Sequence, residues 1–260
     1  MNLSTDYHDI QEGGRIILLY SGGTDSSLIL HELIKRFPNQ LIHTVSLDAP
    51  FLHKIKYESE LKTRRTFIKY LLEQKYPIRH QEISIRHNLI PEMEHYYDDI
   101  RVFNVEPGGC PQAVYWLSTL LIYLKSGDHL YYGLLGIDDN TWCVPYYIEG
   151  MKYFLATLGR EDISLHVPLL YKSKDYVIQK LFEYGIYEHT WHCETPYEEN
   201  VPCLECKPCM DHLKALAGMA EFHEDMEIQK KARVLVDEAK SIIAKRSAEQ
   251  KERLDQILRK

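Results

Sequence analysis

Apolar residues follow two patterns along the first half of the chain, and the two patterns alternate. Short, continuous apolar runs are typical of buried parallel strands. Such a run occurs at 16–19. Strands are also expected at 41–47, at 78–85, where the alternation of apolar and polar residues is imperfect, and at 129–135. Apolar residues spaced three and four apart at 28–34 and 57–75 are typical of helices that bury one face. We therefore predict an α/β fold in which helices cover both faces of a parallel sheet.

The helix predicted over 57–75 carries its apolar residues at helical spacing, so that face should turn toward the sheet. Its apolar positions are Leu61, Phe67, Ile68, Leu71 and Leu72. Arg64 and Arg65 stand between them in the sequence, and we interpret both as part of the solvated face.

The second half of the chain predicts a short strand and several helices. The run at 165–170 is expected to form a strand that leaves the sheet, and Ser173 and Gly185 are expected to cap and end a helix over 174–184. From 220 to 260 the composition shifts to Glu, Lys, Arg and Ala, which predicts one or two long helices. These can pack on the body or on a second subunit of a homodimer, and a solvated tail helix is the alternative. The expected domains are an α/β domain (1–185), a cysteine knuckle with its following helix (186–219) and a helical extension (220–260).

Composition limits the class of protein. With 260 residues, 45% hydrophobic and 27% charged, the chain can fold as one α/β domain with an appendage. The net charge of −7 argues against a broad nucleic-acid surface. No apolar run is long enough to span a membrane, and the polar N-terminus does not resemble a signal peptide, so a cytoplasmic location is expected.

The segment from Tyr20 to Ser27 joins the first predicted strand to the first predicted helix. Gly22 and Gly23 can adopt positive φ and let a ligand approach the backbone. Ser26 or Ser27 can cap the helix, and the N–H groups of its first turn make an anion site. The carboxylate of Asp25 suits such a site when a divalent cation lies between it and a polyphosphate. The segment therefore predicts a phosphate-binding loop.

Two further residues suit a nucleotide site. Asp48 ends the second predicted strand, and ligands of open parallel sheets lie at the carboxyl ends of strands; an ordinary turn before Pro50 is the alternative. Lys174 stands in the first turn of a helix, where a cation is unfavourable. A phosphate partner or simple solvent exposure would remove that conflict.

The cysteines predict a metal centre rather than a disulfide framework, because three of the six lie within seven residues. Cys203, Cys206 and Cys209 form Cys-x2-Cys-x2-Cys, and Cys193 stands ten positions upstream. Four thiolates suit a closed, structural zinc site, and an iron–sulfur cluster is the main alternative. Cys110 lies outside this motif and is interpreted as an ordinary thiol, with a nucleophile as the alternative.

The sequence Ser-Gly-Gly-Thr-Asp-Ser at 21–26 resembles the pyrophosphatase loop of the N-type ATP pyrophosphatases. Together with Thr190-Trp191-His192-Cys193 and the cysteine motif, it resembles the 7-cyano-7-deazaguanine synthases from about Arg15 to about Cys209. The resemblance implies a Rossmann-like fold of the adenine nucleotide alpha hydrolase type. It also implies ATP with Mg²⁺, one structural Zn²⁺ per chain, and cleavage of ATP between the α- and β-phosphates.

The resemblance assigns roles to particular residues. It implies catalytic roles for Ser21, Asp25 and Lys174. The ATP-binding residues that it implies are Tyr20, Ser21, Gly22, Gly23, Thr24, Asp25, Ser26, Ser27, Asp48, Gly133 and Lys174. The substrate side is assigned to Glu106, Gly108, Gly109, Cys110 and Asp138, and the metal to Cys193, Cys203, Cys206 and Cys209.

The chain departs from the family on the substrate side. The family's usual Pro-Gly-Arg-Asn element is here Pro107-Gly108-Gly109-Cys110, without the arginine and the asparagine. We therefore expect adenylation of 7-carboxy-7-deazaguanine or a similar acid, then an amide or nitrile formed with ammonia or another amine, such as one on a protein. The alternatives are a tRNA-thiolating enzyme of the same superfamily and a non-catalytic homologue that binds ATP or a partner.

Overall fold

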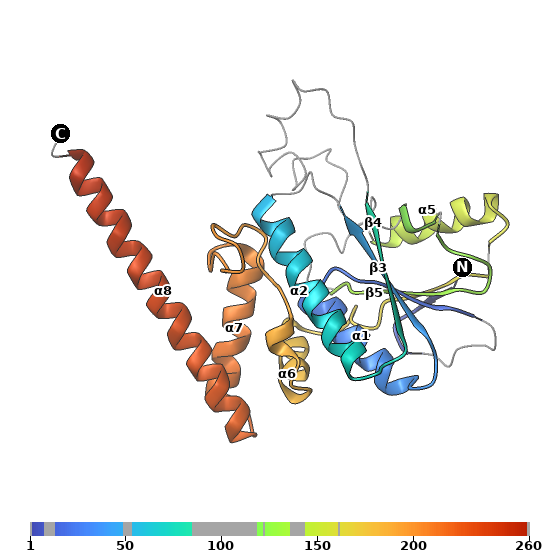
Figure 1. Ribbon diagram of the computed structural model, residues 1–260, viewed down its shortest axis with the longest axis horizontal. Helices are drawn as coiled ribbons and strands as arrows, with labels where there is room; N and C mark the ends of the chain where they lie inside the picture. Colours follow the sequence, from blue (N-terminus) through green and yellow to red (C-terminus); the bar gives the residue numbers. More distant parts are fainter. Residues whose placement is uncertain are drawn as a thin grey trace. The chain divides into compact units, whose positions relative to one another are not determined.

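The structure is a computed structural model, drawn in Figure 1, and its elements divide into two compact units. It describes residues 2–7, 14–48, 54–84, 119–121, 123–135, 144–160 and 162–258. The first unit consists of Met1–Ser173 with Glu188–Trp191, and the second of Lys174–Tyr187 with His192–Lys260.

A six-stranded sheet forms the centre of the first unit, and all of its strand pairs are parallel. Its strands are β1 (Asn2–Ser4), β2 (Ile16–Leu19), β3 (Ile42–Asp48), β4 (Ile78–Ser84), β5 (His129–Tyr132) and β6 (Ser164–His166). The spatial order is β1-β6-β5-β2-β3-β4, so the chain winds to one side of β2 and then returns to wind to the other. This reversal places a topological switch point between β2 and β5, where open α/β sheets bind ligands.

Helices cover the sheet because both of its faces are apolar. All four side chains of β2 are buried, and neighbouring residues of a strand point to opposite faces. Ile17 and Leu19 pack in a cluster with Met151 and Leu155 of α5 (Val144–Thr157), which therefore covers one face. Among the described residues of this unit, α1 (Thr24–Arg36) and α2 (Lys54–Glu73) are also helices. The predicted Rossmann-like α/β architecture is confirmed.

Two predictions about strands were incomplete or wrong. The segment expected to leave the sheet forms β6, which pairs with both β1 and β5 and therefore lies inside the sheet. The three-residue strand β1 was not predicted, because Asn2–Ser4 has a single apolar residue and no alternation.

The second unit is helical. It contains α6 (Lys174–Glu183), α7 (Lys207–Phe222) and α8 (Met226–Leu258), and a 3-10 helix, η4 (Tyr187–His189), lies where the chain leaves it. Ile178 of α6, Leu216 of α7 and Ala232 of α8 share one buried cluster. Gly185 has φ +67°, as expected of a glycine that ends a helix. Among the described helices, none has both the length and the apolar character needed to cross a membrane.

Candidate functional site

The loop between β2 and α1 lies at the carboxyl end of β2, beside the switch point. Gly23 precedes α1 with extended backbone angles, and the helix begins at Thr24 without a hydrogen bond from any capping side chain. The prediction that Ser26 or Ser27 caps this helix is therefore wrong, because both lie within its first turn. An uncapped helix start of this kind suits an anionic ligand.

Ser26 instead closes the loop from inside the helix. Its hydroxyl accepts a hydrogen bond from the backbone N–H of Ser21 at 3.3 Å and lies 3.1 Å from the Ser21 hydroxyl. The Ser21 hydroxyl in turn accepts a hydrogen bond from the N–H of Gly23 at 3.1 Å. These bonds hold the loop in one shape around the helix terminus.

Two glycines allow neighbouring elements to approach the loop closely. Gly22 has φ +87°, and a Cβ added there would lie 3.0 Å from the Cβ of Arg64 on α2. Gly133 follows β5, and a Cβ there would lie 3.1 Å from the backbone nitrogen of Ser26. Gly133 was assigned to this site only through the family resemblance, and its close approach gives that assignment a steric reason.

Trp191 pairs with the loop through its backbone. Its N–H donates to the carbonyl of Gly22 at 3.1 Å, and its carbonyl accepts from the N–H of Thr24 at 3.2 Å. Sequence reasoning placed Trp191 only in the cysteine motif and missed this contact. Backbone pairing leaves no pattern in side chains from which it could have been predicted.

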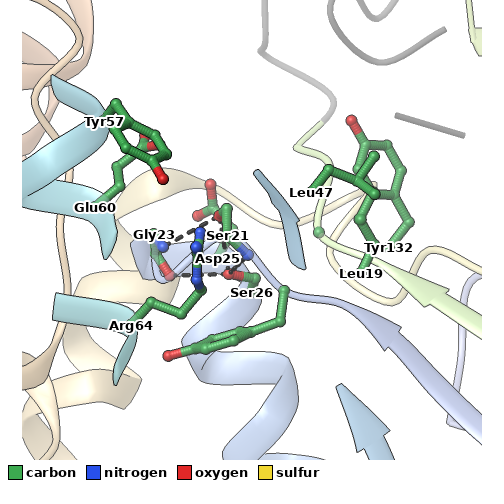
Figure 2. Close-up of a pocket in the computed structure, with 12 residues that line it drawn as sticks. Leu19, Ser21, Gly23, Asp25, Ser26, Leu47, Tyr57, Glu60, Arg64 and Tyr132 are labelled. Carbon is green, nitrogen blue, oxygen red and sulfur yellow. Dashed lines mark hydrogen bonds between the residues drawn. The ribbon is translucent and has the colours of Figure 1, made fainter. Parts of the chain in front are cut away.

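An open pocket of about 670 Å³, including space open to solvent, lies against this loop. Of the residues predicted to bind ATP, those that line it are Tyr20, Ser21, Gly23, Asp25, Ser26 and Gly133. The other lining residues are Leu19, Leu47, Tyr57, Glu60, Arg64 and Tyr132. Figure 2 shows Tyr57, Glu60 and Arg64 of α2 on one side of the loop and Leu19, Leu47 and Tyr132 on the other.

Other predicted residues are not brought to this pocket. Gly22, Thr24 and Ser27 belong to the loop and the start of α1 but do not line it, and Asp48 ends the neighbouring strand β3. Lys174 begins α6 in the second unit, so its role toward ATP stays a prediction. The predicted substrate residues Glu106, Gly108, Gly109, Cys110 and Asp138 lie outside the described residues.

Arg64 corrects the prediction of a solvated face. It is 3% exposed and lines the pocket, whereas the side chain of its neighbour Arg65 is 60% exposed, as expected. Arg65 donates two hydrogen bonds to the carboxylate of Glu82, at 2.6 and 3.0 Å. These bonds, followed by the charge of Arg64, lower the pKa of Glu82 to about 2, so its carboxylate is ionised at neutral pH.

The cysteine motif forms a compact cluster in the second unit. The sulfur atoms of Cys193, Cys203, Cys206 and Cys209 all lie within 4.8 Å of one another, and none is in a disulfide. The backbone N–H groups of Cys206 and Cys203 point at sulfur atoms, at 3.2 Å from Cys203 Sγ and 3.1 Å from Cys193 Sγ. Such N–H···S bonds stabilise thiolates, so the cluster fits a thiolate-bound metal such as zinc or an iron–sulfur cluster.

Hydrogen bonding within the cluster shifts the pKa values of its thiols in opposite directions. Hydrogen bonding with Cys193 lowers the pKa of Cys206 and raises that of Cys209.

The side chain of Arg246 on α8 donates a hydrogen bond to the backbone carbonyl of Cys203 at 2.6 Å, so the long helix supports the cysteine knuckle. Sequence reasoning missed this contact, because Arg246 lies in a run of charged residues typical of a solvated face.

Comparison with known proteins identifies a family model and several proteins that are similar in sequence to this chain. The family model of the queuosine biosynthesis protein QueC matches residues 112–220. The 7-cyano-7-deazaguanine synthase of Rickettsia felis is 26% identical over 220 residues, covering 77% of this chain and 93% of that protein. The enzyme of the same name from Psychromonas ingrahamii is 22% identical, over 78% of this chain and 93% of its own length.

Two solved structures are also similar to this chain, at lower sequence identity. The U34-tRNA thiolase NcsA from Methanococcus maripaludis, solved with its [4Fe-4S] cluster, matches with a TM-score of 0.45 and 13% identity, over 88% of this chain and 74% of that one. A 4-thiouridine synthetase in complex with RNA and ATP matches with a TM-score of 0.43 and 20% identity, over 88% and 54%. The sequence relatives are the more specific finding, because they share one name and extend over most of both chains. The chain is therefore similar to the 7-cyano-7-deazaguanine synthases over most of its length.

Proposed function

We propose that this protein is an ATP-dependent ligase that adenylates a carboxylate, releases pyrophosphate and then joins the acyl group to an amine. The observation that carries the proposal is the loop at 21–26, which surrounds an uncapped helix start at the switch point of a parallel sheet. ATP-dependent chemistry of the pyrophosphatase-loop kind is what the relatives also support.

The reaction needs two displacements. An oxygen of the substrate carboxylate attacks the α-phosphorus of ATP, the bond to the bridging oxygen of the β-phosphate breaks, and pyrophosphate leaves. The amine nitrogen then attacks the acyl carbon, AMP leaves with the electron pair of the C–O bond, and the nitrogen loses a proton. A nitrile would require a second ATP, which adenylates the amide oxygen before AMP and two protons depart.

The loop residues have distinct tasks in this scheme. The backbone around Gly22 and Gly23 and the hydroxyls of Ser21 and Ser26 receive phosphate oxygens at the positive end of α1. The carboxylate of Asp25 lines the pocket and would hold Mg²⁺, which supplies charge neutralisation to the polyphosphate. Lys174 is proposed to add positive charge toward the departing pyrophosphate.

The four-cysteine cluster is proposed to hold one structural Zn²⁺, because four thiolates within 4.8 Å complete a tetrahedral shell. An iron–sulfur cluster would instead point to the tRNA-thiolating alternative. Metal analysis of anaerobically purified protein separates the two, since zinc protein is colourless and iron–sulfur protein is brown.

The proposed acid is 7-carboxy-7-deazaguanine or a similar carboxylate, and the proposed amine is ammonia or another amine, including one on a protein. The test is incubation with Mg·ATP, this acid and ammonia, with products read by mass spectrometry. We expect AMP, pyrophosphate and an amide or nitrile from the wild-type protein, and a loss of AMP release in Asp25→Asn. AMP release that continues unchanged in Asp25→Asn would refute the assignment of the site.

A further inference from the structure

Arg64 is the feature of the pocket that the family resemblance leaves without a role. We propose that its guanidinium binds the phosphate groups of ATP and of the pyrophosphate formed from it. The proposal rests on the proposed function and deepens it, because it adds a cation from α2 to a site otherwise built from the β2–α1 loop.

The position of Arg64 places it against the phosphate loop. It extends from α2 into the pocket that Ser21, Gly23 and Asp25 also line (Figure 2). The backbone of Gly22 approaches α2 so closely that an added Cβ would lie 3.0 Å from the Cβ of Arg64. The positive φ of Gly22 therefore brings the loop and this arginine together.

The guanidinium of Arg64 has unused hydrogen-bonding capacity. The residue is 3% exposed, and its Nε and Nη2 atoms have no hydrogen-bond partner in the part of the chain that the structure describes. Burying a charged donor without a partner is unfavourable, so proteins rarely keep such a group unless a ligand completes it.

Nearby carboxylates do not fully pair with the positive charge of the Arg64 guanidinium. Glu82 lies 3.5 Å from Arg64 Nη2, but both of its oxygens already accept shorter hydrogen bonds from Arg65. One carboxylate thus serves two guanidiniums, and its shorter contacts are with Arg65. The carboxylate of Glu60 also lines the pocket, and it is 3.7 Å from the ammonium of Lys56.

A guanidinium suits phosphate because its planar N–H groups can donate two parallel hydrogen bonds to phosphate oxygens. The acyl substrate also carries a carboxylate, which is the alternative anionic ligand for the guanidinium of Arg64. The phosphates are the better match because Arg64 adjoins the loop at the start of α1, where the helix dipole also favours them.

The experiment compares two adjacent arginines that pair with the same glutamate. Arg64→Met and Arg65→Met remove the same charge, one inside the pocket and one on the exposed face. Titration calorimetry of the full-length protein measures Mg·ATP, Mg·pyrophosphate and adenosine binding. We expect Arg64→Met to weaken ATP and pyrophosphate binding about 10- to 100-fold, the value of a charged hydrogen bond, and to leave adenosine binding unchanged. Arg65→Met should change each dissociation constant by less than about twofold.

Thermal unfolding without ATP tests whether Arg64 has a purely structural role. If Arg64 exists to receive phosphate, removing its buried charge should leave the melting temperature equal to or above that of the wild type. Arg64→Met should also abolish most of the rise in melting temperature that Mg·ATP gives the wild type. A lower melting temperature together with unchanged ATP affinity would overturn the proposal and make Arg64 a structural partner of Glu82.

The outcomes separate this inference from the proposed function. Wild-type protein that binds no Mg·ATP would refute the proposed function itself. Wild-type protein that binds ATP, with Arg64→Met and Arg65→Met indistinguishable, would refute only the role of Arg64. Unchanged ATP and pyrophosphate binding in Arg64→Met, with product formation lost, would assign the guanidinium to the substrate carboxylate and overturn the phosphate assignment.

Discussion

At the scale of single residues, the site depends on how closely backbone segments approach one another. Gly22 combines a φ of +87° with a position where a Cβ would lie only 3.0 Å from the Cβ of Arg64 on α2. Gly159 has a similar φ of +64°, but nothing lies within 4 Å of the place where its Cβ would be. Substitutions at Gly22 and Gly159 can therefore be compared to distinguish the effect of backbone strain from the effect of steric contact with α2.

We predict that Gly22→Ala and Gly159→Ala both destabilise the protein by about 1–2 kcal/mol through strain at positive φ. Gly22→Ala alone should weaken Mg·ATP binding, by about tenfold or more, because its methyl group pushes the loop away from Arg64. Chemical denaturation and titration calorimetry measure the two effects. Equal ATP affinity in the two variants would show that the approach of α2 does not matter for binding.

Arg64 shows what sequence reasoning missed at this scale. It follows Leu61 by three residues and precedes Ile68 by four, so it falls on the apolar stripe of α2. That spacing was visible in the sequence and should have outweighed the general tendency of arginine to be exposed. By contrast, the missing cap on α1 could not be foreseen, because serines in a first turn are common whether or not they cap.

At the scale of elements, the cysteine knuckle could be predicted from the sequence, whereas the shortest strand could not. The spacing of the motif at 203–209 predicts a metal site, and the structure brings its three sulfur atoms together with that of Cys193. Leu204 supports the turn with φ +65°, a conformation that the sequence does not indicate. Short strands such as β1 have too few residues to carry a pattern, so pairing with β6 decides their structure.

We predict that Cys206→Ser removes most of the bound metal and lowers the melting temperature by about 10 °C, because a structural metal contributes several kcal/mol to folding. Cys143→Ser, a substitution outside the motif, should retain one metal per chain and the wild-type melting temperature. Elemental analysis and thermal unfolding give the two readouts. Full metal content in Cys206→Ser would contradict the four-thiolate site.

At the scale of the whole molecule, the order of strands explains why the pocket lies where it does. The alternation of strands and helices predicted a parallel sheet, but the order β1-β6-β5-β2-β3-β4 depends on contacts between distant segments and was not predicted. The switch point between β2 and β5 brings the β2–α1 loop close to Gly133, although the two stand about a hundred residues apart in the sequence.

The first unit should become less stable in mild acid. Burial lowers the pKa of His31 to about 4 and also lowers the pKa values of His43, His80 and His129. Between their ordinary pKa of 6.5 and the lowered values, the unfolded chain binds more protons than the folded one. The free energy of unfolding therefore falls as pH decreases through this window and is unaffected by these groups above it.

We expect His31 alone to account for about 1–3 kcal/mol of this loss. The pKa of Glu82 is lowered as well, but its contribution is lost only below its ordinary value of 4.5, at the acid end of the window. Denaturation measured from pH 7.5 to 4.5 should show a shallower pH dependence in His31→Leu than in the wild type. An identical slope in the two proteins would rule out this role for His31.

The most direct test of the account is the identity of the products of ATP cleavage. Phosphorus NMR of the metal-replete protein with Mg·ATP, 7-carboxy-7-deazaguanine and ammonia distinguishes the two places where ATP can break. We predict AMP and pyrophosphate in equal amounts, because the loop at 21–26 and its pocket are proposed to direct attack to the α-phosphorus. ADP and phosphate as products, or an intact ATP pool in folded protein that retains its metal, would contradict it.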